Sequence, residues 1–317
     1  MKTVCVYHSI DLDGWMSAAI VKHWFKTNNN GYIKDTEDNF CDFIGYNYGQ
    51  PIPDLSEYDK VIMCDISFPK EEMINLYENK DFIWLDHHIS AINESKHSAV
   101  ILSYDDVNGI RDTKFAACEL TWKHFFNNKP MPEIVRLLGR YDCFGHKNTP
   151  EELKVLEFQY GARGVISNYE EAYKELIECQ TYFPQSGYPT REGEILEIGK
   201  AIYSYLCTEA KQSYKNGFTI TFDNVPDRHP MDSFVKYYER KFICINKERF
   251  NPINFGIDYH KDGYDGAACF HYANGKWNFS LYNDNGNVDC SAIAKQYGGG
   301  GHKGAAGFII DNINDII

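Results

Sequence analysis

Short apolar runs that end in acidic or imidazole side chains recur along the first half of the chain. The run from Phe82 to Leu85 is followed at once by Asp86, His87 and His88. A run this short, and this rich in aromatic and branched residues, is typical of a buried strand, and open parallel sheets collect functional groups at the carboxyl ends of their strands. Two solvated histidines at a strand end would give the same pattern, so this run alone decides nothing.

The same pattern occurs twice more, nearer the amino terminus. Apolar runs at residues 4–7 and 61–64 each lead directly into polar residues. The polar side chains that follow these two runs are His8, Asp11, Asp13 and Asp65. Because neighbouring parallel strands end at one edge of a sheet, the repetition predicts a single cluster, and imidazoles with carboxylates suit Mn²⁺ and similar divalent ions. For each segment alone, a plain polar turn is the alternative. Strands are also expected over residues 43–46 and 100–103.

Helical patterns alternate with these strands. Apolar spacing predicts helices over residues 15–25, 113–126 and 132–139. The second of these has Thr113 or Asp112 as its expected N-cap. The third runs into Asp142, which is either a further acid at the same edge or an ordinary loop residue. These elements together predict an α/β domain over residues 1–148, with a mostly parallel sheet flanked by helices.

The pattern changes twice beyond residue 148. Helical spacing continues over residues 149–217, which we interpret as a helical connector between two domains. Short strands then prevail, so residues 218–317 are expected to form a smaller α+β domain. The expected strands cover residues 218–222, 242–245, 267–272, 277–282 and 308–310. Asn274 and Gly275 predict a hairpin turn, and Asp289 is the expected cap of a short helix.

A run of four glycines follows that short helix and precedes the last strand. Consecutive glycines let a backbone approach an anion and point its N–H groups at it, while a neighbouring imidazole and ammonium add positive charge. We therefore interpret the segment as a phosphate cradle, with a flexible linker as the alternative. The residues of this segment expected to contact substrate are Gly299, Gly300, Gly301, His302 and Lys303.

Composition and charge limit the classes of partner. The chain has 317 residues, of which 43% are hydrophobic, so two domains with sizeable cores are expected. Ten scattered cysteines without a C-x-x-C pair indicate a reducing compartment, and no apolar run is long enough to cross a bilayer, so a cytoplasmic protein without a membrane partner is expected. The net charge is −13, and no basic stripe for long duplex nucleic acid is visible. A phosphate-bearing substrate would be short, with metal ions offsetting the acidic groups.

Taken together, these segments resemble the DHH phosphoesterase family with its C-terminal DHHA1 substrate-binding domain, which includes oligoribonucleases and 3′-phosphoadenosine 5′-phosphate phosphatases. The matching pieces, in the family's order, are His8 to Gly14, Asp65, Asp86-His87-His88, Asp142 and Gly299 to Gly307. The resemblance implies a two-metal phosphoesterase, with Mn²⁺ or Mg²⁺, that hydrolyses short oligonucleotides or small nucleotides with a metal-activated water.

The resemblance also implies a role for each residue. The implied ligands are His8, Asp11 and Asp65 for one ion, and Asp13, Asp65, His87 and Asp142 for the other, with Asp65 bridging. His88 would face the scissile phosphate, and Asp86 would orient the neighbouring imidazole. Two ions about 3.5–4 Å apart can share a water and lower its pKa, so no side-chain nucleophile is needed.

One departure from the family bears on the substrate. The strand before the final helix carries Tyr282 where family nucleases often have an arginine, and we interpret this tyrosine as a stacking surface for a base. Two other functions stay open. One is phosphoanhydride hydrolysis, as in the related manganese pyrophosphatases and polyphosphatases, and the other is a non-catalytic nucleotide sensor on the same scaffold.

Overall fold

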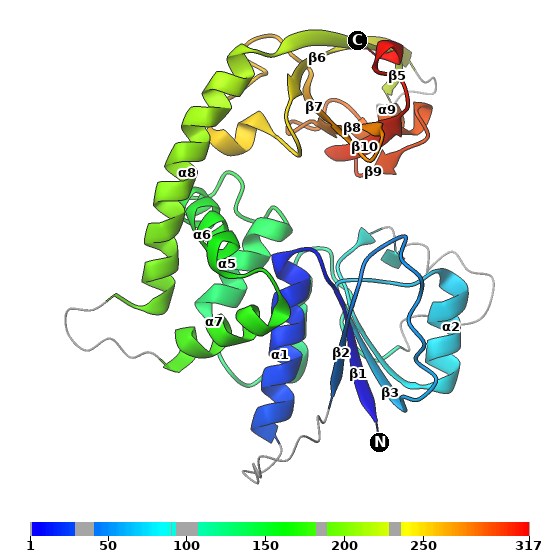
Figure 1. Ribbon diagram of the computed structural model, residues 1–317, viewed down its shortest axis with the longest axis vertical. Helices are drawn as coiled ribbons and strands as arrows, with labels where there is room; N and C mark the ends of the chain where they lie inside the picture. Colours follow the sequence, from blue (N-terminus) through cyan, green and yellow to red (C-terminus); the bar gives the residue numbers. More distant parts are fainter. Residues whose placement is uncertain are drawn as a thin grey trace. The chain divides into compact units, whose positions relative to one another are not determined.

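The computed structural model of the protein divides into two compact units, Met1–Ile202 and Tyr203–Ile317 (Figure 1). The residues that it describes are 2–28, 41–89, 91–92, 107–181, 189–227 and 236–316. The strand expected over residues 100–103 lies outside them. The division of the chain into three parts at residues 148 and 217 stays a prediction.

The first unit is built on a sheet of four parallel strands in the order β2-β1-β3-β4. The strands are β1 (Thr3–His8), β2 (Asp42–Tyr46), β3 (Lys60–Cys64) and β4 (Asp81–Leu85). Each lies within one residue of the apolar run that predicted it. The chain crosses to β2 on one side of β1 and to β3 on the other, and ligands of open α/β sheets bind outside the strand ends at such a switch point.

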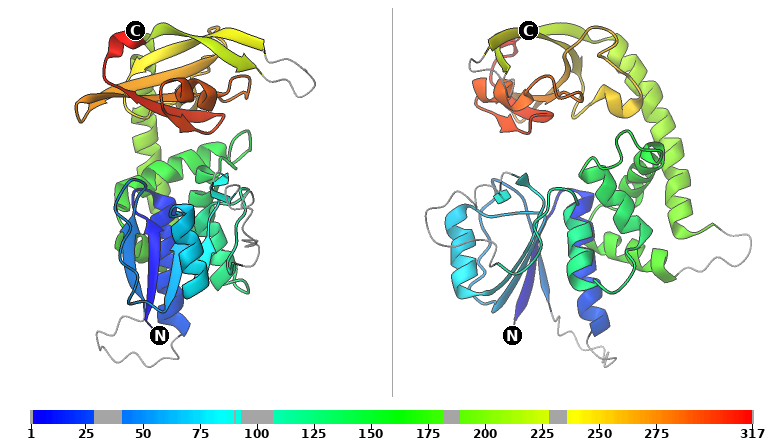
Figure 2. Two further views of the ribbon diagram at one scale, coloured as in Figure 1. Left: turned by 90° about the vertical axis from the view of Figure 1, so that its right-hand side faces the viewer. Right: turned by 180° about the vertical axis from the view of Figure 1, so that it is seen from behind.

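Helices cover both faces of this sheet. Among those that pack directly on it are α1 (Leu12–Asn28) and α2 (Lys70–Asn79). Successive residues of a strand point to opposite faces, so Val6 packs in a core with Met73 of α2, while Tyr7 packs in another with Ala18 of α1. Figure 1 and the right-hand view of Figure 2 show α1 and α2 on either side of the strands. The predicted α/β architecture is therefore confirmed.

Further helices share a core with α1. They are α4 (Ala117–Phe125), α5 (Glu133–Asp142), α6 (Glu152–Val165), α7 (Tyr169–Thr181) and α8 (Arg191–Lys215). This core contains Met16 of α1, Trp122 of α4 and Phe158 of α6. Helices α6 and α8 meet backbone to backbone, because a Cβ atom at Gly161 would lie 2.0 Å from the carbonyl oxygen of Ile195. Helices α6 and α7, expected as parts of a connector, thus contribute to the core of the first unit.

Helix α8 belongs to both units. Its residue Ile195 is buried in the core that contains α1 and α6. Further along the same helix, Ala210 is buried in a core of the second unit with Ile243 and Tyr259. One continuous helix therefore takes part in two separate cores.

The start of α4 corrects an expectation. The helix begins at Ala117, and neither Thr113 nor Asp112 is its N-cap. The carboxylate of Asp13, in the first turn of α1, accepts hydrogen bonds from the backbone N–H groups of Ala117 and Cys118, both at 2.8 Å. A side chain distant in the sequence thus accepts the hydrogen bonds that a local N-cap would otherwise accept. A local sequence pattern cannot reveal such a contact.

The second unit contains a mixed sheet of six strands in the order β5-β6-β7-β8-β10-β9, in which β6 and β7 pair in parallel. Its elements are β5 (Phe218–Asp227), β6 (Lys236–Asn246), a 3₁₀ helix (Pro252–Phe255), β7 (Gly266–Ala273), β8 (Lys276–Tyr282), α9 (Cys290–Gln296), β9 (Gly300–Gly301), β10 (Ala305–Ile310) and a 3₁₀ helix (Ile313–Asp315). Asn274 and Gly275, with φ of 55° and 78°, form the predicted hairpin turn. Asp289 caps α9 as predicted.

Two findings concern the whole of the described chain. All ten cysteines are free thiols, and most of them are buried. Among the residues that the structure describes, no helix combines the length and the apolar character needed to cross a bilayer.

Candidate metal centre

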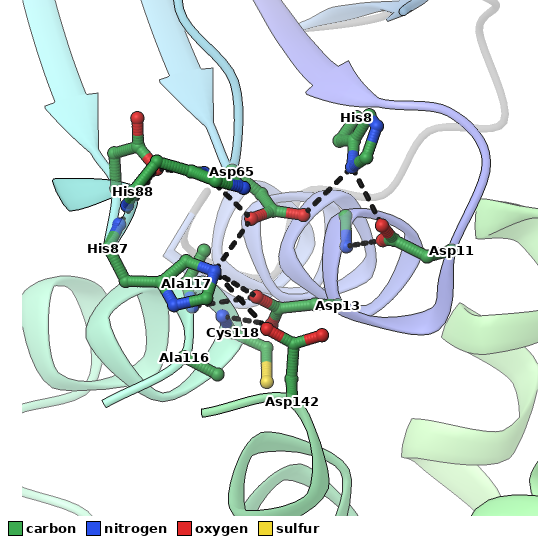
Figure 3. Close-up of polar contacts among 12 residues, drawn as sticks. His8, Asp11, Asp13, Asp65, His87, His88, Ala116, Ala117, Cys118 and Asp142 are labelled. Carbon is green, nitrogen blue, oxygen red and sulfur yellow. Dashed lines mark hydrogen bonds and ion pairs between the residues drawn. The ribbon is translucent and has the colours of Figure 1, made fainter. Parts of the chain in front are cut away.

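Seven titratable side chains converge where the strands of the first unit end (Figure 3). They form three groups in which the potential ligand atoms lie within 4.8 Å of one another. The groups are His8, Asp11 and Asp65; Asp65, His87 and His88; and Asp13, His87 and Asp142. The structure thus brings together all the side chains that the sequence suggested as metal ligands.

Asp65 lies at the centre of the cluster. It directly follows β3, with a left-handed φ of 62° that turns the chain there. Its Oδ2 lies 3.3 Å from Nδ1 of His8, and its Oδ1 lies 3.3 Å from Nε2 of His87. No hydrogen bond from the described residues reaches the buried Oδ1 atom. Since a buried carboxylate oxygen is costly without a donor or a cation, this atom fits a metal site.

The first turn of α1 is pressed against the end of β1. Nδ1 of His8 lies 2.7 Å from Oδ2 of Asp11, whose Oδ1 accepts a hydrogen bond from the N–H of Gly14 at 3.0 Å. A Cβ atom at Gly14 would lie only 2.0 Å from the carbonyl oxygen of His8. The absence of a side chain at Gly14 therefore permits the approach that places an imidazole and a carboxylate side by side.

The other side of the cluster joins three elements. Nε2 of His87 lies 3.2 Å from Oδ2 of Asp142 and 3.7 Å from Oδ2 of Asp13. Asp142 is the last residue of α5, and its contact with His87 places it beside the other acids at this edge. Asp13 is held in place by its two hydrogen bonds from the start of α4 (Figure 3).

Asp86 fixes the turn that carries the two histidines. It is fully buried, and its Oδ1 accepts hydrogen bonds from the backbone N–H groups of His87 at 2.7 Å and His88 at 3.1 Å. The same oxygen lies 2.8 Å from Nδ1 of His88. The imidazole that Asp86 orients is therefore that of His88.

The carboxylates raise the pKa of each imidazole in the cluster. Burial lowers the pKa of His8, but hydrogen bonds with Asp11 and Asp65 outweigh it and raise the pKa to about 10. Burial also lowers the pKa values of His87 and His88, but nearby carboxylates outweigh it and raise them to about 11 and about 9. The carboxylates thus stabilise the protonated, positively charged form of each of these imidazoles.

Burial and mutual repulsion raise the pKa values of several carboxylates in the cluster as well. Burial, with the charge of Asp65, raises the pKa of Asp13 to about 7. Burial, with the charge of Asp13, raises the pKa of Asp142 to about 7. The pKa of Asp65 is raised by its burial and by Asp11. Carboxylates that repel one another in a buried place are stabilised by a divalent cation, and the set of oxygen and imidazole ligands suits Mn²⁺ or Mg²⁺.

The glycine-rich segment lies in the second unit. Gly300 and Gly301 form the short edge strand β9, paired with β10. The N–H of His302 donates to the carbonyl oxygen of Ala305 at 2.7 Å, and the N–H of Ala305 donates back at 3.2 Å, so Lys303 lies at the tip of a tight turn. The phosphate cradle stays a prediction. In it, this turn would present the side chain of Lys303 to the phosphate.

A cavity of about 460 Å³ borders the sheet of the second unit. Gly299 and Gly307 line it, together with Arg249 and Ser280 among others. Tyr282 is half-buried and packs against the core that also contains Ala210 of α8. Stacking of a base on this tyrosine stays a prediction.

The sequence reasoning missed one aromatic residue beside the metal ligands. Tyr48 lies in the turn after β2, and its ring centroid is 6.1 Å from that of His8 and 6.4 Å from that of His88. The available signal was the position of the residue, because the predicted strand at 43–46 ends at the same edge as the other strands. It escaped notice since this strand, unlike the others, is not followed by an acid or an imidazole.

Comparisons with known proteins agree with this architecture. Residues 3–139 match the N-terminal domain of the DHH family. The chain is 26% identical, over 99% of its length, to an uncharacterized protein of Acanthamoeba polyphaga mimivirus, of which it covers 69%. The pGpG-specific phosphodiesterase PggH of Vibrio cholerae is similar in structure, with 16% identity, a TM-score of 0.52, and coverage of 99% of this chain and 95% of that one. An exopolyphosphatase-related protein of Bacteroides fragilis has 14% identity, a TM-score of 0.51, and coverage of 98% and 87%.

Proposed function

We propose that this chain, whose residues 3–139 match the N-terminal domain of the DHH family, is a metal-dependent phosphoesterase. Its substrates would be short oligonucleotides or small nucleotides. The observation that carries the proposal is the position of Asp65, whose two oxygens face His8 and His87 from the centre of the ligand groups. The similar fold of a pGpG-specific phosphodiesterase supports the proposal.

Two divalent cations, Mn²⁺ or Mg²⁺, fit the ligand groups. We assign one ion to His8, Asp11 and Asp65, and the other to Asp13, Asp65, His87 and Asp142. When bound, the ions would supply an activated water and offset the negative charge of the phosphate. Asp65 would belong to both sets, because each of its oxygens faces a different imidazole.

His88 would act on the phosphate from beside the metal ligands. Its Nδ1 is taken by the carboxylate of Asp86, which leaves Nε2 for the substrate. The nearby carboxylates raise the pKa of His88 to about 9, against the lowering effect of burial. With Nδ1 held by Asp86, Nε2 is the atom through which His88 would contact a phosphate oxygen.

The glycine-rich segment of the second unit would bind phosphate. We propose that residues 218–317 are a DHHA1-like domain, joined to the first by residues 149–217, and that Gly299 to Lys303 contact phosphate. The net charge of −13 argues for a short substrate rather than long duplex nucleic acid. The free thiols of the ten cysteines support a reducing, cytoplasmic setting.

A panel of substrates tests the proposal. Manganese-dependent hydrolysis would be measured on end-labelled dinucleotides to pentanucleotides, a long single strand, 3′-phosphoadenosine 5′-phosphate and pyrophosphate. Preference for the shortest oligonucleotides or for the small nucleotide is expected. Turnover of pyrophosphate alone would point to a phosphoanhydride hydrolase, and manganese binding without any turnover would point to a nucleotide sensor.

A matched pair of variants tests the assigned site. Asp65→Ala is expected to abolish hydrolysis in a folded protein, because both ligand sets lose the shared carboxylate. Asp54→Ala, which removes an exposed carboxylate from a loop, is expected to keep wild-type activity. Substantial hydrolysis by a folded Asp65→Ala protein would refute the assignment of Asp65 as the shared ligand.

A further inference from the structure

Tyr48 presents a half-exposed ring beside the metal ligands. Its side chain is 51% exposed, although it lies close to two imidazoles of the cluster. The ring planes of His8 and His88 are inclined to it by 58° and 81°, so neither imidazole stacks face to face on it. Part of a flat aromatic surface is therefore exposed at this edge.

The turn that carries this ring is fixed at both ends. The N–H of Ser9 donates to the carbonyl oxygen of Tyr46 at 3.1 Å, which ties the end of β2 to the end of β1. The N–H of Gln50 donates to the carbonyl oxygen of Asn47 at 3.1 Å, and Gly49 takes the positive φ of 85° that this turn requires. The backbone that carries the ring is therefore fixed, so little backbone entropy is lost when a ligand stacks on the ring.

Other exposed apolar side chains adjoin the ligands in the sequence. Ile10 directly precedes Asp11, Ile89 directly follows the two histidines, and Phe144 lies two residues after Asp142. Their side chains are 47%, 46% and 58% exposed. Inorganic phosphates offer no apolar surface, whereas a nucleotide carries a flat, largely apolar base next to its phosphate.

We infer that Tyr48 is the stacking platform for a nucleobase next to the phosphate bound at the metal centre. The inference rests on the proposed function and narrows it, because a platform of this kind favours nucleotides over inorganic phosphoanhydrides. Every base has a π-face, so the platform selects for the presence of a base rather than for its identity. The ring, not the hydroxyl group, carries this role.

A binding experiment isolates the base from the rest of the ligand. Adenosine 5′-monophosphate and ribose 5-phosphate share the sugar and the phosphate, and differ in the base. Their dissociation constants would be measured on the full chain with manganese present. The wild-type protein is expected to bind the nucleotide about 5- to 150-fold more tightly, which corresponds to the loss found when a stacking aromatic is replaced by alanine.

Three variants locate the effect. Tyr48→Ala is expected to lose the preference for the nucleotide, while its affinity for ribose 5-phosphate stays the same. Tyr48→Phe is expected to retain the preference, because the ring remains. Tyr205→Ala removes another exposed tyrosine, on α8, and is expected to retain the preference as well. Circular dichroism would verify that each variant is folded.

Several outcomes would overturn the inference. They are a Tyr48→Ala protein that keeps the wild-type preference, a Tyr48→Phe protein that loses it, and a wild-type protein that binds the two ligands equally or binds neither. Since the measurement does not depend on turnover, its failure differs from failure of the proposed function. A preference that depends on Tyr48, in a protein without hydrolytic activity, would uphold the platform and remove the phosphoesterase proposal.

Discussion

Replacement of Gly14 by alanine would test how the contact between α1 and β1 sets the geometry of the metal ligands. A Cβ atom at this position would lie 2.0 Å from the carbonyl oxygen of His8 and 2.7 Å from its Cβ atom, where ordinary contacts begin near 3.4 Å. Both neighbours belong to the end of a buried strand and cannot swing aside. The first turn of α1 or the end of β1 must therefore shift by more than about 1 Å.

That shift is large compared with the tolerance of a metal site. Ligand distances vary by only about 0.2 Å between well-formed sites, so His8 and Asp11 would no longer meet the same ion. We expect manganese affinity at this site to fall by at least about 100-fold. The effect on folding is smaller, because alanine gains about 1 kcal/mol of helix propensity and overpacking costs about 1–3 kcal/mol.

Isothermal titration with manganese would measure the affinity, and urea denaturation of the metal-free protein would measure the stability. Gly164→Ala in α6 is the matched control, since its new Cβ atom would meet Ile202 Cδ1 at an ordinary 3.4 Å. The control is expected to bind manganese normally and to gain about 0.5–1 kcal/mol of stability. A folded Gly14→Ala protein with wild-type manganese affinity would refute the argument that this close approach sets the ligand separation.

Three further predictions concern the same residues and the second unit. Asp13→Ala is expected to lower the free energy of unfolding of the metal-free protein by about 1–3 kcal/mol, because two buried N–H groups at the start of α4 lose their acceptor. Asp11→Ala should lower it by less, because the side chain of Asp11 is 40% exposed. Equal losses in urea denaturation would contradict this prediction. Near pH 8 manganese binding is expected to release protons, because the pKa values of His8 and His87 are raised to about 10 and about 11 and both rings must become neutral to act as ligands. Calorimetry in buffers of different ionisation enthalpy measures this proton release. A binding enthalpy that does not depend on the buffer would argue against it. Lys303→Ala is expected to raise the KM for nucleotide substrates while manganese affinity is unchanged, and an unaltered KM would exclude a phosphate contact by this lysine.

The parts of the fold that depend on local pattern could be predicted from the sequence. Each strand of the first sheet is a short apolar run bounded by polar residues, so its limits are set by its own side chains. The same holds for the hairpin at Asn274 and Gly275, where the required φ values favour these two residue types. The convergence of His8, Asp65 and His87 followed from a geometric rule, since parallel strands end at a common edge.

The parts that depend on contacts between distant residues could not be predicted in this way. The N–H groups at the start of α4 are held by Asp13, far away in the sequence, and such a contact leaves no periodic trace. The place of Asp142 at the end of α5 depends on how that helix packs against α4 and α6, which its own residues do not specify. Tyr48 was missed because a search for acids and imidazoles passes over an aromatic ring.

The continuous helix α8 has a consequence for how the protein unfolds. Helix formation is cooperative, so melting of the half that carries Ile195 would remove hydrogen-bonded neighbours from the half that carries Ala210. Both cores contain residues of this one helix, so loss of the helix from one core would also destabilise the other. A ligand that binds only the native first unit stabilises it by mass action, and this protection would extend through the helix to a part of the chain that the ligand does not touch.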